Sequence, residues 1–500
     1  MQQEKAEAPL ILTIDAGSSS VRAMLFDRQG RAVTGVEGHE PCQLHTTTEG
    51  AVEESADEML ARIERCIDTA LQQAGALTSA IGAVACDTLA SNILAIDTAG
   101  RPLTPLITYA DTRNADDAVA LRRQLDERSV HDRTGCMLRT SYWPARLAWF
   151  RRTQPEVWRT AVRWITLGEL LEQRFFGQSR LSYSIASWSG LLDRKKLVWD
   201  APLLAAVGLT QDHLSPLVDV HEPMRGLAAP YAARWPALRD VPWFPAIGDG
   251  AAANVGSGCI GHERLALTIG TSGAMRVILD DVAQIPAGLW AYRVDRRRAL
   301  LGGATSEGGN VYAWMLETLQ LSERNAIEQG LEQMQPDSHG LTILPFLAGE
   351  RSPGWAGDVK ATISGLGLST TPLAILRASL EAVAYRFALI ARAIDEPSGA
   401  NHRFIASGGG LLRSPAWMQI FADVLGRPVI ASAEPEATSR GVALLALETL
   451  GVIPDLQALP AADGAVYQPD QTRHERYQAA IARQQQFYDV LIAHDPEQRL

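Results

Sequence analysis

The fold is decided by the stretch Leu12-Thr-Ile-Asp-Ala-Gly-Ser-Ser-Ser-Val-Arg-Ala-Met-Leu-Phe-Asp27. Its first apolar run ends at Asp15-Ala-Gly17, a turn rich in glycine and serine follows, and Val21 to Phe26 form a second apolar run. Short apolar runs bounded by turn residues are typical of buried strands. The stretch therefore predicts a β-hairpin whose tip presents backbone N–H groups and hydroxyls.

A similar stretch occurs about half the chain later, Leu267-Thr-Ile-Gly-Thr-Ser-Gly-Ala-Met-Arg-Val-Ile-Leu-Asp280. Both stretches predict a strand, a turn of small residues and a second strand, with an Arg and a closing Asp at similar places. An internal duplication would leave this pattern, and chance similarity of two hairpins is the alternative. Two such turns on two similar halves could hold a triphosphate from both sides, because turns of this kind bind phosphate oxygens.

The segments between and after the hairpins alternate between strand and helix patterns. Glu53 to Gln73 and Thr371 to Ile394 have the apolar spacing of helices, whereas Ile81 to Val84 and Ile93 to Ile96 resemble strands. This alternation predicts the α/β class. A chain of 500 residues is long enough for more than one domain.

Composition excludes several classes of protein. The net charge of −11 argues against broad contact with nucleic acid, which needs clustered basic residues. No stretch approaches the ~20 apolar residues that span a bilayer, and the first residues lack a secretory pattern. The five cysteines are scattered without a C-x-x-C pair, which is typical of reduced thiols. We therefore expect a cytoplasmic protein with no nucleic-acid or membrane partner.

Two familiar nucleotide motifs do not apply. No G-x-x-x-x-G-K-[ST] is present, which excludes a P-loop NTPase. The pattern G-x-G-x-x-G does occur at Gly256 to Gly261, but Gly250 to Val255 before it has the character of a helix rather than a strand. Its glycines would then end a helix, which argues against a dinucleotide site.

Two aspartates and a glycine run could take part in chemistry. Asp249 follows an apolar strand and could accept a proton from a substrate hydroxyl, or it could cap the helix that follows. Asp15 could hold a Mg²⁺-bound water, or belong to a polar hairpin turn. Gly408 to Gly410 could let a nucleotide approach the backbone closely, or form a strand-to-helix turn. These alternatives stay open on the residues alone.

Five segments together resemble the FGGY carbohydrate kinases of the actin-like ATPase superfamily, over nearly the full chain. They are DAGSSSVR (15–22), GDGAAANVGSG (248–258), TIGTSGAMR (268–276), LAGERSPGW (347–355) and GGGLLRSPAWMQIFADVLG (408–426). The resemblance implies two actin-like (ribonuclease H-like) ATPase domains, residues 8–252 and 253–496, with a cleft between them. It implies that the first domain binds the sugar and carries the first phosphate loop, whereas the second binds the nucleotide.

The resemblance also implies site residues. Asp249 matches the catalytic base, and Asp15 the carboxylate that holds Mg²⁺ through water. ATP would contact the two phosphate loops and further positions of the second domain, namely Asp15, Gly17, Ser18, Ser19, Arg22, Gly270, Thr271, Gly309, Gly408, Gly409, Gly410 and Ser414. The candidate carbohydrate contacts are Ser91, Asn92, Tyr109, Asp111 and Asp249.

The substrate is less well defined. Tyr183-Ser-Ile-Ala-Ser187 is similar to gluconate kinases, but Ala90-Ser91 stand where a Met-His pair is usual, and Arg146 replaces a usual Lys. We predict ATP-dependent phosphorylation of a hydroxyl of a small sugar, sugar acid or polyol, with gluconate or a related sugar acid as best guess. The alternatives are a ketose such as xylulose or sedoheptulose, and a non-catalytic, sugar-responsive protein. The oligomeric state is open, a homodimer being one alternative.

Overall fold

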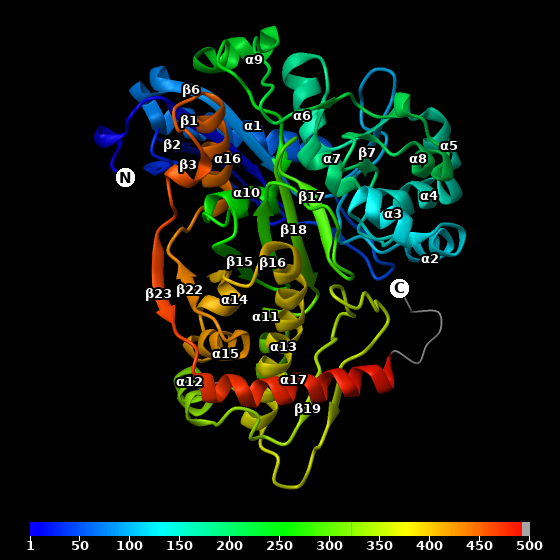
Figure 1. The fold of residues 1–500 in the computed structure, drawn as a ribbon. Coiled ribbons are helices and arrows are strands. Elements are labelled where there is room, and N and C mark those ends of the chain that lie inside the picture. Colours follow the sequence, from blue (N-terminus) through cyan, green and yellow to red (C-terminus); the bar gives the residue numbers. More distant parts are fainter. Residues whose placement is uncertain (322, 493–500) are drawn as a thin grey trace. The chain divides into compact units, whose positions relative to one another are not determined.

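The computed structural model describes residues 1–321 and 323–492, and it divides the chain into two compact units (Figure 1). The first unit consists of Met1–Gly258, Ala291–Leu300 and Glu436–Pro460, and the second of Cys259–Trp290, Leu301–Pro435 and the chain from Ala461 onward. Each unit therefore includes segments that are far apart in sequence. The limits 8–252 and 253–496 stay a prediction, and residues 493–496 lie outside the described residues.

A five-stranded sheet forms the centre of the first unit, in the order β14-β6-β1-β2-β3. β1 (Leu10–Ala16) and β2 (Ser20–Phe26) pair antiparallel, which confirms the first predicted hairpin. β6 (Ile81–Thr88) lies parallel to β1, and β14 (Ile247–Gly248) parallel to β6. β3 (Ala32–Pro41) completes the sheet beside β2. The carboxyl ends of β1, β6 and β14 therefore meet at one edge.

Helices cover this sheet with their apolar sides. α1 (Ala56–Ala74) begins at the N-cap Ser55, whose hydroxyl accepts a hydrogen bond from the Glu58 N–H over 3.3 Å. It buries Met59, Ile63 and Ile67 in the same core cluster as β1 and β2.

α10 (Asp249–Gly256) and α16 (Ala437–Thr449) pack very closely. A Cβ on Gly256 would lie 1.7 Å from the Ala437 carbonyl oxygen, and one on Gly441 would lie 1.9 Å from that of Ala252. Only glycine permits this approach. The glycines of the G-x-G-x-x-G pattern thus begin at the end of a helix, as predicted.

The remaining elements of the first unit are short. The strands are β4 (His45–Thr46), β5 (Val52–Glu54), β7 (Leu94–Ile96), β8 (Leu106–Ile107), β9 (Arg163–Ile165), β10 (Leu181–Ser182), β11 (Leu192–Asp193), β12 (Val198–Trp199) and β13 (Leu217–Val218). The helices are α2 (Ala115–Gln124), α3 (Glu127–Thr134), α4 (Trp143–Thr153), α5 (Pro155–Thr160), α6 (Leu167–Phe176), α7 (Tyr183–Ser189), α8 (Ala201–Val207) and α9 (Ala229–Arg234).

The second unit is built on a seven-stranded sheet, in the order β17-β18-β16-β15-β21-β22-β23. β15 (Arg264–Ile269) and β16 (Gly273–Leu279) form the second predicted hairpin. β21 (Arg403–Ser407) lies parallel to β15, and β22 (Val429–Ser432) parallel to β21. The other strands of this sheet are β17 (Trp290–Arg293), β18 (Ala299–Thr305) and β23 (Asp463–Tyr467), of which Ala291–Arg293 and Ala299–Leu300 are counted with the first unit. A separate pair consists of β19 (Thr342–Leu344) and β20 (Thr362–Ser364).

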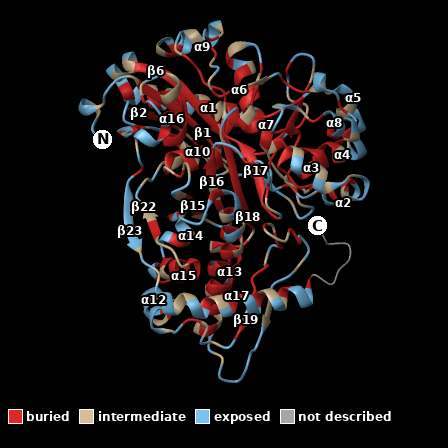
Figure 2. Ribbon diagram, viewed as in Figure 1, coloured by how far each residue is buried: buried red, intermediate tan, exposed pale blue. Residues whose placement is uncertain are grey.

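The helices of the second unit are α11 (Gly309–Thr318), α12 (Arg324–Gln333), α13 (Pro372–Ser398), α14 (Gly409–Leu412), α15 (Pro415–Leu425) and α17 (Gln471–Leu491). α13 is buried along most of its length, whereas α17 alternates between buried and exposed residues (Figure 2). α15 ends at Gly426, whose φ of 64° is the left-handed conformation that glycine adopts without strain.

Two general expectations can be compared with the structure. The five cysteines all lie within the described residues, and no disulfide joins them there. Among the helices of residues 1–321 and 323–492, none has both the length and the apolar character needed to cross a membrane. The cytoplasmic location and the oligomeric state stay predictions.

Candidate active site

Three carboxylates lie at neighbouring strand ends of the first unit. Asp15 is opposite Asp87 in the register of β1 and β6, and Asp87 is opposite Ile247 in the register of β6 and β14. Asp249 follows β14 directly and is the first residue of α10. Ligands of open α/β sheets bind beyond the carboxyl ends of parallel strands. The structure thus brings the predicted Asp15 and Asp249 to one edge.

Burial and mutual repulsion dominate the electrostatics of these carboxylates. Burial raises the pKa of Asp15 to about 6, and the charge of Asp249 acts in the same direction, whereas a hydrogen bond with Asp87 and the charge of Arg22 oppose it. Asp87 is 0% exposed, and burial together with the charges of Asp15 and Asp249 raises its pKa well above the ordinary value. Asp87 therefore keeps its proton to a higher pH than an ordinary aspartate does.

Asp87 was not predicted as a site residue from the sequence. Hydrogen bonds with the Asp15 carboxyl group and with the backbone of Asp87 itself both affect the pKa of this buried carboxyl group. Two ionised carboxylates can only accept hydrogen bonds, so their contact requires a shared proton. A carboxylate inside an apolar strand is rare unless it is paired, and this signal could have identified Asp87.

The hairpin tip lies next to this edge. The Gly17 N–H donates to the Ser20 carbonyl over 3.0 Å, which closes the turn that contains Ser18 and the exposed Ser19. Arg22 is opposite Asp15 in the hairpin register, and its guanidinium lies 2.6 Å from the carboxylate of Glu436. Glu436 belongs to the first unit although it is 414 residues away in sequence.

Asp249 does not act as the cap of α10. The N-cap residue is Gly248, and the Asp249 carboxylate accepts a hydrogen bond from the N–H of Gly250 over 2.7 Å. The Gly248 N–H donates to the Ser184 hydroxyl over 3.2 Å, so α7 fixes the backbone just before Asp249. The capping alternative is therefore wrong.

Glycines take the equivalent positions in the second unit. The Gly309 N–H donates to the Gly270 carbonyl over 2.9 Å, and a Cβ on Gly309 or Gly410 would lie 2.5 or 2.6 Å from that same oxygen. Gly408 has a φ of 88°, and a Cβ there would lie 2.4 Å from the Ile269 carbonyl oxygen. We call Gly270, Gly309 and Gly408–Gly410 the glycine cluster. It joins the predicted second phosphate loop to the predicted nucleotide residues within one unit.

Two further predicted nucleotide residues differ in their surroundings. Thr271 is exposed, and its carbonyl accepts from the N–H of Asn310 over 3.0 Å. Ser414 is buried, and its hydroxyl accepts from the Trp417 N–H over 3.2 Å as the N-cap of α15. Ser414 thus fixes the helix that follows the glycine cluster.

Ser91 is held in an unusual turn. Its φ of 54° is rare for a residue other than glycine, and its hydroxyl donates to the Ser141 carbonyl over 2.6 Å. The guanidinium of Arg146 donates to the carbonyls of both Ser91 and Ser141. Arg146 is buried, which lowers its pKa to about 9. The Arg that replaces the usual Lys therefore supports the turn.

The other candidate carbohydrate contacts differ in their burial and in their hydrogen-bond partners within the protein. Asn92 is buried, and its amide donates to the Leu89 carbonyl over 2.6 Å and accepts from the Leu167 N–H over 2.7 Å. Asp111 accepts from Arg113 at 2.7 Å, whereas Tyr109 is 40% exposed. Asn92 and Asp111 thus have internal partners, and all of these sugar contacts stay predictions.

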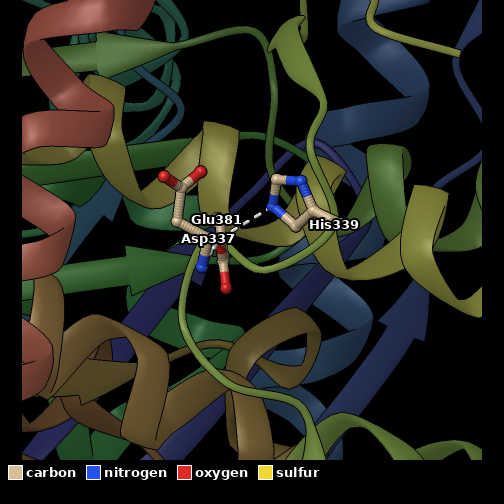
Figure 3. A group of neighbouring side chains, drawn as sticks. All are labelled: Asp337, His339 and Glu381. Carbon is tan, nitrogen blue, oxygen red and sulfur yellow. Dashed lines mark hydrogen bonds and ion pairs between the residues drawn. The ribbon is translucent and has the colours of Figure 1, made fainter.

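Asp337, His339 and Glu381 form the group that most resembles a metal site, and Figure 3 shows them together. His339 Nε2 lies 3.1 Å from a Glu381 oxygen, and the Leu341 N–H donates to Nδ1 over 3.0 Å. Each carboxylate also contacts an arginine: Arg377 for Glu381, and Arg483 for Asp337. Because these cations neutralise the group, we interpret it as a network between α13 and α17.

Comparison with known proteins gives consistent results. Residues 10–256 match the profile "FGGY family of carbohydrate kinases, N-terminal domain", and residues 265–449 match its C-terminal domain. A gluconokinase of Bacillus subtilis (strain 168) is 29% identical over 469 residues, 91% of each chain. A glycerol kinase of Geobacter sp. (strain M21) is 28% identical over 90% of this chain and 92% of its own.

Solved structures share the fold. A gluconate kinase from Lactobacillus acidophilus superposes with a TM-score of 0.91 at 23% identity, over 97% of this chain and 98% of its own. A xylulose kinase from the same organism also gives a TM-score of 0.91 at 23% identity, over 97% and 99% of the two chains. The α/β class with two actin-like ATPase domains is thereby confirmed.

Proposed function

The chain belongs to the FGGY family of carbohydrate kinases, and we propose that it transfers the terminal phosphoryl group of ATP to a hydroxyl of gluconate or a related sugar acid. Relatives named gluconokinase, alignable over 91% of the chain, support this substrate class. The observation that carries the proposal is the position of Asp249, at the start of α10 and on the same sheet edge as Asp15.

Asp249 is the proposed general base. Its carboxylate accepts the proton of the attacking hydroxyl while the substrate oxygen bonds to the terminal phosphorus and the bond to the ADP oxygen breaks. Phosphoryl transfer depends mainly on positioning and charge neutralisation, so one base is sufficient. The Ser184 contact to Gly248 keeps this base in place.

Asp15 is the proposed holder of Mg²⁺, through a bound water. The residues fit this ion, because Mg²⁺ prefers oxygen ligands and keeps most of its waters. When bound, the ion neutralises charge on the phosphates. Asp87 has a hydrogen bond with Asp15 and a raised pKa, so we assign it the role of donating to Asp15 and orienting its carboxylate.

The phosphates of ATP are assigned to both hairpins. In the first unit, Gly17, Ser18, Ser19 and Arg22 surround the turn. In the second unit, Gly270 has no heavy atom within 4 Å of the Cβ position it lacks, which leaves room for a phosphate beside the backbone. Gly309 and Gly408–Gly410 with Ser414 are assigned to the nucleotide.

The alternatives are a ketose or polyol substrate and a non-catalytic role. The likeness to a xylulose kinase and to glycerol kinases supports including ketoses and glycerol in any test. The combination of Asp249, Asp15 and both turns argues against a protein that only senses sugars.

The test is ADP release by the purified protein with Mg²⁺ and ATP, across sugar acids, ketoses and polyols. We expect strong turnover of gluconate that Asp249→Asn abolishes. Turnover of a ketose alone would replace the substrate and keep the reaction. Absence of turnover with every compound would overturn the proposed function.

A further inference from the structure

Trp188 is the aromatic residue packed against the backbone that precedes Asp249. It lies in α7, and its Nε1 would be 2.7 Å from a Cβ on Gly248. The indole therefore occupies the space that a side chain at position 248 would need. The indole thus lies beside the residue that directly precedes the proposed base Asp249.

The ring is held by a rigid stack. Trp188 and Tyr292 are stacked, with ring centroids 4.0 Å apart and an interplanar angle of 24°. Tyr292 is buried, and its hydroxyl lies 2.6 Å from that of Tyr142. The Ser187 hydroxyl also accepts from the Arg293 N–H over 2.8 Å, which fixes the segment with Tyr292 against α7. Trp188 itself is only partly buried, so the stack leaves indole surface accessible.

The same support extends to the Ser91 turn. Tyr142 is adjacent to Ser141, whose carbonyl accepts from the Ser91 hydroxyl and from Arg146. A Cβ on Gly190, which ends α7, would lie 3.2 Å from that of Tyr142, so α7 packs tightly on this segment. The indole and the Ser91 turn are thus both held by contacts with residues 141–142, of which Tyr142 is buried.

A partly accessible aromatic ring beside the proposed base suits a carbohydrate substrate. Sugars and sugar acids of five or six carbons have C–H surfaces beside their hydroxyls, and a large rigid aromatic ring covers such surface at low entropic cost. Glycerol, with three carbons, offers an aromatic ring much less C–H surface.

We propose that Trp188 is a specificity-determining residue of the carbohydrate site, whose indole packs on the C–H face of the substrate and favours five- and six-carbon chains over glycerol. This inference rests on the proposed function, because it places the reacting hydroxyl at Asp249. It adds a selective contact to the candidate carbohydrate residues.

The experiment compares Trp188→Ala and Trp188→Phe with the parent protein. We expect Trp188→Ala to raise the KM for gluconate about tenfold, which corresponds to the loss of one good aromatic contact, and to leave the KM for ATP unchanged. The preference for gluconate over glycerol in kcat/KM falls by a similar factor. Trp188→Phe keeps a ring and shows a smaller change, so it also serves if the alanine variant does not fold.

A purely structural role for Trp188 gives a different result. It would lower kcat or the unfolding temperature and leave both the KM for gluconate and the gluconate-to-glycerol preference unchanged, which would overturn the inference. The matched control is Trp158→Ala, another partly buried tryptophan of the first unit, which lies in α5 with its ring centroid 5.6 Å from that of Trp164. We expect its kinetic constants to equal those of the parent.

Calorimetric binding of gluconate without ATP separates this inference from the proposed function. About tenfold weaker binding by Trp188→Ala supports the inference even if no ADP is ever formed, in which case the kinase proposal alone fails. Equal binding by parent and variant, or no binding by the parent, overturns the inference.

Discussion

The two hairpins differ in chemistry although their surroundings are alike. β1 pairs antiparallel with β2 and parallel with β6, and β15 pairs antiparallel with β16 and parallel with β21. Each sheet then adds one more parallel strand, β14 or β22. This shared topology supports the duplication that the sequence predicted.

The strand ends show the difference. In the first unit, Asp15 and Asp87 are the next-to-last residues of β1 and β6, and Asp249 directly follows β14. In the second unit, β15 and β21 end just before Gly270 and Gly408. Carboxylates can bind protons and metal ions, and glycines let another molecule approach the backbone. Two sheets of similar topology thus offer different groups at their strand ends, carboxylates in the first unit and open backbone in the second.

The substitution with the largest expected effect is Asp249→Asn, which tests whether the carboxylates of the first unit carry out the reaction. Removal of a general base lowers rates by about 10²–10⁴-fold, and we expect a loss of kcat near 10³-fold with little change in the KM for ATP. Steady-state ADP release measures it. The matched control is Asp280→Asn, an exposed carboxylate after the second hairpin, for which we expect parental activity. Similar losses in both variants would contradict this assignment to the first unit.

The second test is Gly270→Ala. No atom lies within 4 Å of the added Cβ, so the unfolding temperature should not change. If phosphates approach this backbone, the KM for ATP should rise about tenfold, because the methyl group displaces them.

Alanine substitutions at two other glycines are compared with Gly270→Ala. Gly367→Ala, also without neighbours within 4 Å, is the control and should leave the KM for ATP as in the parent. Gly309→Ala should lower stability as well, since its Cβ would lie 2.5 Å from the Gly270 carbonyl oxygen. An unchanged KM in Gly270→Ala would remove this turn from the phosphate site.

The third test compares the arginines of the two hairpins. Arg22 lies opposite Asp15, whereas Arg276 lies opposite Ala266. We expect Arg22→Gln to raise the KM for ATP about fivefold, as a partly exposed charge contributes roughly 1 kcal/mol. Arg276→Gln should change it less than twofold. Equal effects would mean that both hairpins bind phosphate through arginine.

The parts predicted best from sequence are local. The hairpins follow from apolar runs and turn residues, and α1 and α13 follow from the helical spacing of apolar residues in Glu53 to Gln73 and Thr371 to Ile394. By contrast, the strand predicted at Ile81 to Val84 extends to Thr88. The prediction stopped short because the carboxyl group at position 87 interrupts the apolar pattern. Such a group can nevertheless be buried when it shares a proton.

Long-range features could not be predicted in this way. Nothing local indicates that Glu436–Pro460 belongs to the first unit, or that Glu436 pairs with Arg22. The stack of Trp188 on Tyr292 likewise joins segments about a hundred residues apart. Such contacts depend on packing of the whole unit, which a pattern of neighbours in sequence does not contain.

The smallest expected effect concerns Asp87→Asn. Because the pKa of Asp87 is raised in the folded protein, the folded state keeps its proton to a higher pH than the unfolded state does. Stability from this group is therefore greatest below the ordinary Asp pKa of about 4 and is lost as pH rises. Relative to the parent, the variant should therefore gain stability as the pH rises from 4 to 8. Thermal unfolding across this range measures it.

Asp97→Asn is the control with opposite sign, because hydrogen bonding by Arg101 lowers the pKa of Asp97. A pH-independent difference for Asp87→Asn would mean that this carboxyl group does not hold a proton at the sheet edge.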